Sequence, residues 1–320
     1  MQRLVSHCLS ILREKGYNVV EVFAMKIVKT IPVFKDYIWG GVKLKEAFHK
    51  ATEMSPVAES WELAAHKDGT SGFEGESFDL NDLFNSHREL IGTNAEKFQR
   101  FPMIIKLIDA RDNLSVQVHP SDEYALKNEN SYGKTEMWYV VDAEDGAGLY
   151  VGFKRDVSED EFRTLIAENR LQEVLNFIPV KPGEHYFIEA GTVHAIGKGV
   201  VIAEVQQNSN LTYRLYDYGR VGADGKPREL HVEKGVKVSK LTAYVADGRT
   251  SCDYFTCDSF DLGGSRTLVA DEKSFVAIVI MDGAVTIDGQ KFAKGDTVFV
   301  PAGYGAFTIV GEAKLLCARV

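Results

Sequence analysis

Short apolar runs separated by turn residues dominate the chain from Met25 onward. They are rich in β-branched and aromatic residues and are bounded by Gly, Asp or Asn, which is typical of short strands. Many such strands with recurrent Gly turns predict a mainly β fold of the jelly-roll barrel or sandwich type. The clearest runs lie at residues 25–34, 60–66, 103–110, 114–119 and 136–141.

Two passages have a different pattern and predict a small helical portion. Residues 78–98 carry helix-forming residues with a few apolar positions. In residues 158–177, Ser158 and Glu161 have the spacing of a capping box at a helix N-terminus. The apolar positions of this second passage recur at helical spacing, at Phe162, Leu165, Ile166 and Leu171.

A twelve-residue frame occurs twice in the chain. Residues 183–194 read GEHYFIEAGTVH and residues 295–306 read GDTVFVPAGYGA, so both combine a Gly, a strand and an Ala-Gly turn. The first copy ends on His194, whereas the second has Ala306 in that position. We interpret the repeat as two related β-barrels, of which the first alone keeps a metal ligand. The alternative is chance, because a strand, a Gly turn and a second strand are common in all-β proteins.

This repeat predicts the organisation of the chain. We expect an N-terminal extension at residues 1–24, a catalytic domain with helical insertions at 25–240 and a second, related domain without metal ligands at 241–320. Charged residues interrupt the apolar positions of the extension, which argues against a signal peptide. We assign no function to the extension.

Composition and charge exclude some classes of function. The 320 residues are 45% hydrophobic and 26% charged, which is ordinary for one large or two medium globular domains. A net charge of −9 argues against nucleic acid as a partner, although a local pocket of Lys and Arg can still bind a small anion. No apolar run is long enough to span a membrane. Four cysteines without a paired framework indicate a reducing, cytoplasmic location: Cys8, Cys252, Cys257 and Cys317.

Four polar residues in strand-like segments form a candidate metal site. Gln117 and His119 are two apart on a strand and therefore face the same way. Glu136 lies in another strand, expected to run antiparallel to the first, and His194 follows a Gly at a strand corner. Two imidazoles, a carboxylate and an amide oxygen suit a divalent ion that keeps exchangeable positions. Taken one at a time, each residue is more simply an ordinary strand residue.

A second polar pair comes from the segment around residues 208–210. If these three residues form a hairpin loop, Glu204 and Arg214 are neighbours across the two strands. They then form either an exposed ion pair of little energetic value or a polar pair in the barrel mouth. In the second case Arg214 would stabilise an oxyanion, and Glu204 would orient it or move protons. The sequence leaves both readings open.

Two further residues share the predicted faces of the metal ligands. Lys134 precedes Glu136 by two residues, and Ser115 precedes Gln117 by two. An ammonium group beside a metal site either binds an anion or acts as a base. Both side chains could equally be solvent-facing.

With these residues in hand, the chain resembles the short bacterial form of the class I mannose-6-phosphate isomerases, zinc enzymes of the cupin superfamily. The resemblance runs from about Met25 to Val320. It is carried by the segments PVFKDYIWGGVKL, ESWELAAH, LSVQVHP, GKTEMWYV and AGTVHAIGKGVVIAEVQQNSNLTYRLYDYGR.

The resemblance implies a fold and a set of site residues. The fold would be two cupin-type jelly-roll barrels, and one Zn²⁺ per chain would be bound by Gln117, His119, Glu136 and His194. The catalytic side chains would be Arg214, Glu204 and Lys134, and the substrate would contact Ser115, Lys134 and Trp39.

The implied reaction interconverts mannose 6-phosphate and fructose 6-phosphate through an enediol(ate). Zinc and Arg214 would stabilise the developing negative charge, and Lys134, Glu204 or a metal-bound water would transfer the proton. The partner is then a small hexose phosphate, and we expect a monomer or weak homodimer. The alternatives are another metal-dependent cupin enzyme, such as an epimerase or oxygenase, and a cupin that binds sugar phosphate without catalysis.

Overall fold

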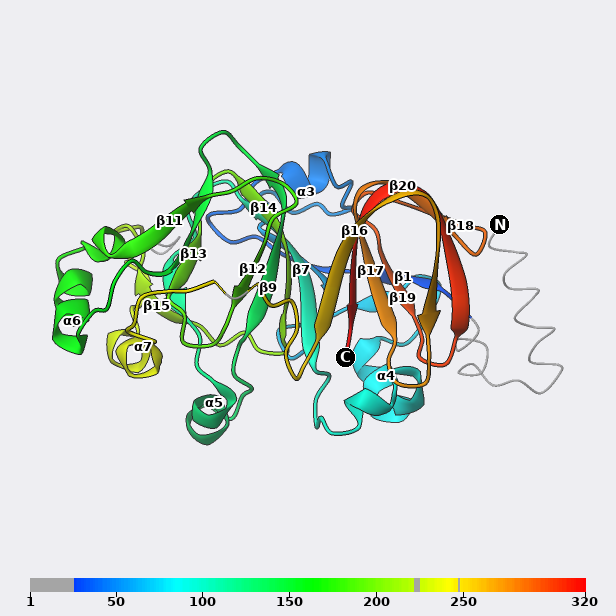
Figure 1. The fold of residues 1–320 in the computed structure, drawn as a ribbon, viewed down its shortest axis with the longest axis horizontal. Coiled ribbons are helices and arrows are strands. Elements are labelled where there is room, and N and C mark those ends of the chain that lie inside the picture. The colour runs from blue at the N-terminus through cyan, green and yellow to red at the C-terminus, as the bar shows by residue number, and fades with distance from the viewer. Residues whose placement is uncertain (1–25, 222–224, 247) are drawn as a thin grey trace.

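The computed structural model describes residues 26–221, 225–246 and 248–320, so the predicted extension lies outside the described residues. Strands form most of this part of the chain and build two units that lie side by side (Figure 1). The prediction of a mainly β fold is confirmed. The described strands form open sheets, so the closure of each unit into a barrel stays a prediction. Among the described residues, no helix is long and apolar enough to cross a lipid bilayer.

Two sheets face each other in the first unit. Alternate side chains of both sheets meet in an apolar layer that includes Trp138, Leu149 and Ile202. The five-stranded sheet has the order β11 (Leu175–Pro179), β10 (Gly148–Phe153), β13 (His194–Ile196), β8 (Val116–Val118) and β15 (Tyr213–Tyr216). The six-stranded sheet has the order β12 (His185–Ile188), β9 (Glu136–Ala143), β14 (Val200–Gln207), β7 (Met103–Ala110), β3 (Glu59–Leu63) and β2 (Val33–Lys35).

The second unit is built on a seven-stranded sheet from both ends of the described chain. Its order is β16 (Thr256–Ala270), β20 (Gly305–Arg319), β17 (Val276–Ile287), β19 (Thr297–Val300), β1 (Val28–Ile31) and β6 (Gly72–Phe73), with β18 (Gln290–Ala293) paired to β17. The early strands β1 and β6 therefore belong to the C-terminal sheet. The division at residue 240 stays a prediction, and strands from both before and after this residue form the seven-stranded sheet. A separate pair is formed by β4 (Ala65–His66) and β5 (Gly69–Thr70).

The helical portion is small, as predicted. Within residues 158–177 a helix begins after Ser158, whose hydroxyl accepts a hydrogen bond from the Glu161 N–H at 3.2 Å. The reciprocal half of the predicted capping box is missing, because the Glu161 carboxylate pairs with Arg155. The helices are α3 (Lys43–Glu46), α4 (Leu80–Ser86), α5 (Asp122–Asn128), α6 (Glu159–Ala167) and α7 (Val232–Val238), with 3₁₀ turns at Arg88–Leu90, Thr93–Ala95 and Leu171–Glu173.

The repeated twelve-residue frame has the same local structure in both copies. Strands β12 and β19 each begin two residues after a glycine with positive φ, Gly183 at 100° and Gly295 at 90°. The Ala-Gly turns match as well, with φ of 89° at Gly191 and 78° at Gly303. All four values lie in the region that favours glycine, so the frame reflects a shared backbone requirement.

An apolar core joins the two units. Phe275 stacks between Phe101 and Phe299, with ring centroids 5.7 and 5.1 Å away, and all three are almost fully buried. A buried ion pair adds to this boundary, because Lys50 lies 2.5 Å from the Glu62 carboxylate. The Thr297 hydroxyl donates to the same carboxylate at 2.9 Å, so the buried charge is both paired and hydrogen-bonded.

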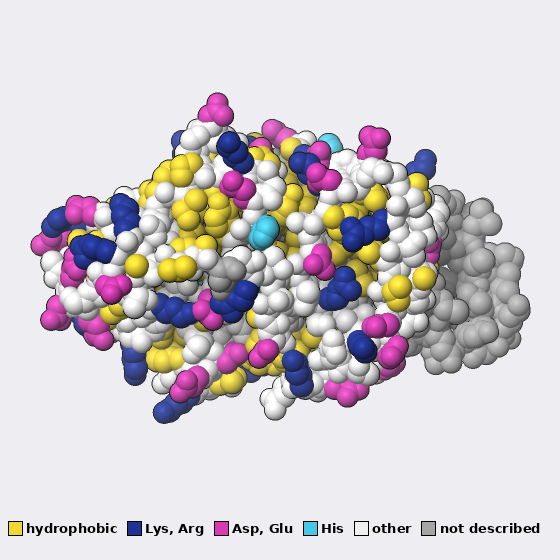
Figure 2. Space-filling model, in the orientation of Figure 1, with side chains coloured by type: hydrophobic (Ala, Val, Ile, Leu, Met, Phe, Trp, Pro, Cys, Tyr) yellow, Lys and Arg dark blue, Asp and Glu magenta, His cyan; other side chains and the backbone are white. Residues whose placement is uncertain are grey.

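The surface drawn in Figure 2 mixes basic and acidic side chains. Lys and Arg do not gather into a continuous stripe over the described part of this face.

We expect Phe275→Ala to lower the free energy of unfolding by about 3–5 kcal/mol, because it removes a fully buried ring and leaves a cavity between the units. Denaturant titration followed by tryptophan fluorescence measures this loss. The control is Val245→Ala, at a side chain that is 81% exposed, which we expect to change stability by no more than about 0.5 kcal/mol. Equal effects of the two substitutions would show that the aromatic stack is not a major part of the core.

Candidate active site

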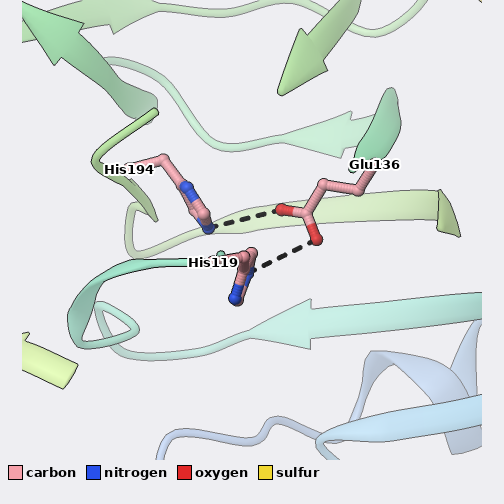
Figure 3. A group of neighbouring side chains, drawn as sticks. All are labelled: His119, Glu136 and His194. Carbon is pink, nitrogen blue, oxygen red and sulfur yellow. Dashed lines mark ion pairs between the residues drawn. The ribbon is translucent and has the colours of Figure 1, made fainter. Parts of the chain in front are cut away.

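Three candidate ligands meet between the two sheets of the first unit (Figure 3). His119 directly follows β8, and His194 begins β13 in the same five-stranded sheet. Glu136 begins β9 in the opposite sheet. The Nε2 atoms of His119 and His194 lie 3.6 and 3.3 Å from the two carboxylate oxygens of Glu136. The strands of His119 and Glu136 belong to different sheets, so the two residues approach each other across the sandwich.

Backbone carbonyl groups fix the orientation of both imidazoles. Nδ1 of His119 lies 2.9 Å from the carbonyl oxygen of Leu211, and Nδ1 of His194 lies 2.8 Å from that of Thr192. Each Nδ1–H therefore donates to a carbonyl oxygen, which leaves the Nε2 lone pair directed toward Glu136. A second hydrogen bond of this kind is the usual support of a metal-ligating histidine.

Unpartnered polar atoms indicate that the residues fit a cation. His194 Nε2 and Glu136 Oε1 are buried and have no hydrogen-bond partner among the described residues. Both atoms offer lone pairs, and burying two such acceptors against each other is costly. A divalent ion between them would satisfy both, and the donor set of imidazole nitrogen and carboxylate oxygen suits zinc.

Gln117 lies in the same row of side chains as His194 and Arg214. In the register of the five-stranded sheet, Gln117 of β8 is opposite His194 of β13 on one side and Arg214 of β15 on the other. Residues opposite each other in a sheet point to the same face. Gln117 lines the central cavity, and His119, which directly follows β8, belongs to the buried cluster. That the two side chains share a face stays a prediction.

Burial shifts the pKa values of these groups toward their neutral forms. It lowers the pKa of His194 to about 4 and holds that of His119 well below its usual value. Burial, together with the nearby Glu204 carboxylate, raises the pKa of Glu136 to about 8. Neutral imidazoles are the form that binds a metal, and a cation would favour the ionised form of Glu136.

A cavity of about 290 Å³ adjoins this cluster and collects the other predicted residues. Its walls include Trp39, Ser115, Gln117, Lys134, Glu204 and Arg214, which were assigned to three different roles from the sequence. The cavity also contains residues that the sequence reasoning did not select: Tyr37, Glu59, Lys106 and Arg228. The structure leaves the roles of the six predicted residues as predictions, and no role is assigned to the other four.

Lys134 lies at the junction of the cavity and the ligand cluster. Its Nζ is 2.7 Å from Glu136 Oε2 and 3.2 Å from His119 Nε2, and the side chain is almost fully buried. Strand β9 begins only at Glu136, so Lys134 belongs to the preceding loop. Its side chain nevertheless points the same way as Glu136, as the sequence suggested.

Buried charges of alternating sign continue across the six-stranded sheet from Lys134. Lys134 Nζ lies 3.9 Å from Glu204, and Lys106 Nζ lies between Glu204 at 3.3 Å and Glu59 at 3.4 Å. Burial alone would raise the pKa of Glu204, but Lys134 and Lys106 hold it at about 2. Indole N–H groups complete the arrangement, because Trp138 donates to Glu204 at 2.8 Å and Trp61 donates to Glu59 at 2.6 Å.

The predicted cross-strand pairing of Glu204 and Arg214 is wrong. Strand β14 lies in the six-stranded sheet, where Glu204 is opposite Lys106 and Trp138, whereas β15 lies in the five-stranded sheet. The segment between them crosses from one sheet to the other. Its Asn208 is buried and donates to the carbonyl oxygen of Phe101 at 2.7 Å, unlike the exposed tip of a hairpin. Glu204 and Arg214 still share the cavity, from opposite sheets.

The Arg214 guanidinium is held by a backbone carbonyl group and also has an unpartnered nitrogen. Its Nη1 donates to the carbonyl oxygen of Glu229 at 3.0 Å, whereas its buried Nε has no partner among the described residues. Burial, with Arg228 nearby, lowers its pKa, yet a guanidinium stays charged at neutral pH. The nearby Arg228 donates two hydrogen bonds to Asp217, at 2.7 and 2.5 Å, and Arg220 also donates to this carboxylate.

These features define a cupin-type β protein with a candidate divalent-metal site beside a charged cavity. Residues 27–146 match the family model for the phosphomannose isomerase type I catalytic domain, and residues 249–320 match that for the mannose-6-phosphate isomerase cupin domain. With these matches and the relatives below, the chain belongs to the mannose-6-phosphate isomerase family, as its sequence motifs suggested.

Relatives of known name match almost the whole chain. Mannose-6-phosphate isomerase ManA of Bacillus subtilis is 38% identical over 311 residues, which covers 90% of this chain and 97% of the relative. The mannose-6-phosphate isomerase of Streptococcus mutans is 33% identical over 88% of this chain and 94% of the relative. The crystal structure of the mannose 6-phosphate isomerase from Bacillus subtilis superposes with a TM-score of 0.85 at 32% identity, covering 92% of this chain and 99% of that one.

We expect His194→Ala to lower zinc affinity by at least about a hundredfold, because it removes one of three clustered ligands. Metal analysis of the purified protein and competition with a chromophoric chelator measure the change. The control is His185→Ala, which removes an exposed imidazole from β12 and should leave zinc binding unchanged. Full zinc occupancy in the His194→Ala protein would contradict the assignment of the cluster as a metal site.

Proposed function

We propose that the chain is a zinc-dependent aldose–ketose isomerase that interconverts mannose 6-phosphate and fructose 6-phosphate through an enediol(ate). The observation that carries the proposal is a pair of imidazoles whose Nε2 atoms face a buried carboxylate at the end of a charged cavity. Membership of the family supports the choice of substrate, since relatives that match about nine-tenths of the chain are named mannose-6-phosphate isomerase. Two cupin-type barrels, divided near residue 240, are part of the same proposal.

Four residues would hold the metal. His119, Glu136 and His194 form the cluster, and Gln117 adds an amide oxygen from the same row of the sheet. The bound ion would supply Lewis-acid stabilisation of charge on the substrate oxygens, and zinc does so without redox chemistry. The buried walls exclude water from this end of the cavity.

Charged residues around the cavity would bind the substrate and move the proton. Arg214 faces the cavity from the five-stranded sheet, where its guanidinium would stabilise the negative charge that develops on the substrate. Lys134 and Glu204 are the candidate groups for proton transfer between C1 and C2. Ser115 and Trp39 line the same cavity and would contact the sugar phosphate, whose remote phosphate supplies binding energy.

The direct test is release of fructose 6-phosphate from mannose 6-phosphate in a coupled assay. We expect turnover by the purified protein, its loss after treatment with a chelator, and its recovery on addition of Zn²⁺. Binding of the sugar phosphate without turnover would identify a non-catalytic cupin instead. Activity restored by iron but not by zinc, or a different product, would indicate another cupin enzyme.

We expect Arg214→Ala to retain zinc and to lower kcat/KM by about 10²–10³-fold, because it removes a charge aimed at the developing oxyanion but no metal ligand. Metal analysis and steady-state kinetics on the same preparation separate the two effects. The control is Arg163→Ala, which removes an arginine from the exposed surface of α6. Loss of zinc from the Arg214→Ala protein would make Arg214 a structural residue.

A further inference from the structure

The loop between β8 and β9 returns on itself so that its two ends touch. The backbone N–H of Lys134 donates to the carbonyl oxygen of Pro120 at 3.0 Å. A Cβ atom on Gly133 would lie 2.5 Å from the backbone of Ser121 and Asp122, which is closer than any side chain permits. Glycine at position 133 therefore allows the residue before Lys134 to pack directly on the residues after His119.

Two side chains hold the backbone on either side of Lys134. The Asp122 carboxylate accepts a hydrogen bond from the Gly133 N–H at 2.7 Å. The Gln207 amide oxygen accepts one from the Thr135 N–H, also at 2.7 Å. The Gln207 amide nitrogen in turn donates to both oxygens of Asp122, at 3.1 and 3.2 Å. Asp122 and Gln207 thus form one connected clamp around Lys134.

The side chain of Tyr254, near the start of the C-terminal unit, contacts this clamp. Tyr254, two residues before β16, donates its hydroxyl hydrogen to Asp122 Oδ2 at 2.9 Å. Its ring lies between Phe98 and Tyr132, with centroids 4.8 and 5.4 Å away. The ring contacts fix where the hydroxyl lies, and the hydroxyl fixes one oxygen of the carboxylate that holds Gly133. The hydrogen bonds that Tyr254 and Gly133 donate to Asp122 both go to a carboxylate, and bonds to charged groups are the stronger class.

We propose that Tyr254 is a positioning residue for the active site, which holds Lys134 in place through Asp122 and Gln207. This inference rests on the proposed function for its kinetic consequence, because Lys134 contacts His119 and Glu136 directly. Without the hydroxyl, Asp122 Oδ2 keeps only the longer hydrogen bond from Gln207, at 3.2 Å, and the carboxylate is held less firmly. The N–H groups of Gly133 and Thr135 then lose well-aligned acceptors, and small displacements of a catalytic group reduce the rate steeply.

The test is Tyr254→Phe, which keeps the ring contacts and removes only the hydroxyl. We expect kcat for mannose 6-phosphate to fall about tenfold, with KM changed by less than about twofold and zinc content unchanged. In the metal-free protein, we expect amide hydrogen exchange at Gly133 and Thr135 to become about tenfold faster. Asp122→Asn replaces an acceptor by a donor within the clamp and should increase both effects.

The matched control is Tyr304→Phe. The Tyr304 hydroxyl donates to the Asp288 carboxylate at 2.9 Å, so the same kind of bond is lost elsewhere in the C-terminal unit. We expect wild-type kcat and wild-type exchange at Gly133 and Thr135 in this variant.

Three results would overturn the inference. In the first, amide hydrogen exchange at Gly133 and Thr135 of the Tyr254→Phe protein equals that of the Tyr304→Phe control. In the second, exchange in the Tyr254→Phe protein increases equally throughout β9 and β16. In the third, its kcat stays at the wild-type value although the two amides exchange faster. Failure of the wild-type protein to turn over mannose 6-phosphate would refute the proposed function. The exchange comparison would still decide whether Tyr254 holds the loop.

Discussion

The structure of the site depends on burying the Glu136 carboxylate beside two imidazoles from the opposite sheet. A carboxylate without exposure needs compensation, which Lys134 supplies on one side and a cation bound with His119 and His194 would supply on the other. The alternating charges that continue through Glu204 and Lys106 extend this requirement across the sheet. The floor of the cavity is therefore polar, connected and almost inaccessible to water.

The surrounding fold makes this burial tolerable. Apolar side chains fill the rest of the space between the two sheets, and indole N–H groups satisfy carboxylate oxygens that face them. Backbone carbonyl groups fix both imidazoles in one tautomer. Little reorganisation is then needed when charge develops on a bound molecule, which is how preorganised sites stabilise transition states.

Local patterns in the sequence predicted the parts of the site that depend on neighbouring residues. The two-residue spacing of Gln117 and His119 predicted a shared face, and the repeated glycine frame predicted the turn at Gly191 that precedes His194. The family motifs added the residues that share the cavity. Strand composition also predicted the mainly β fold.

Long-range pairing was not accessible in the same way. The segment at residues 208–210 looks like a hairpin turn because its residue types suit one, yet buried hydrogen bonds to distant carbonyl groups make it a crossing between sheets. Lys106 was overlooked because its strand is mostly apolar, and only the three-dimensional pairing shows Glu59 and Glu204 on either side of it. Such partners come from separate strands, so no local spacing encodes them.

The pairing of β1 with β19 has a consequence for how the molecule is assembled. Val28 pairs with Phe299, so the first residues of β1 have no partner in their sheet until nearly all of the chain has been synthesised, whereas Thr30 and Ile31 pair with the early strand β6. Contacts of such large sequence separation form slowly and leave an edge exposed in the meantime. Strands from both ends of the described chain thus complete one sheet, which ties the folding of the two halves together.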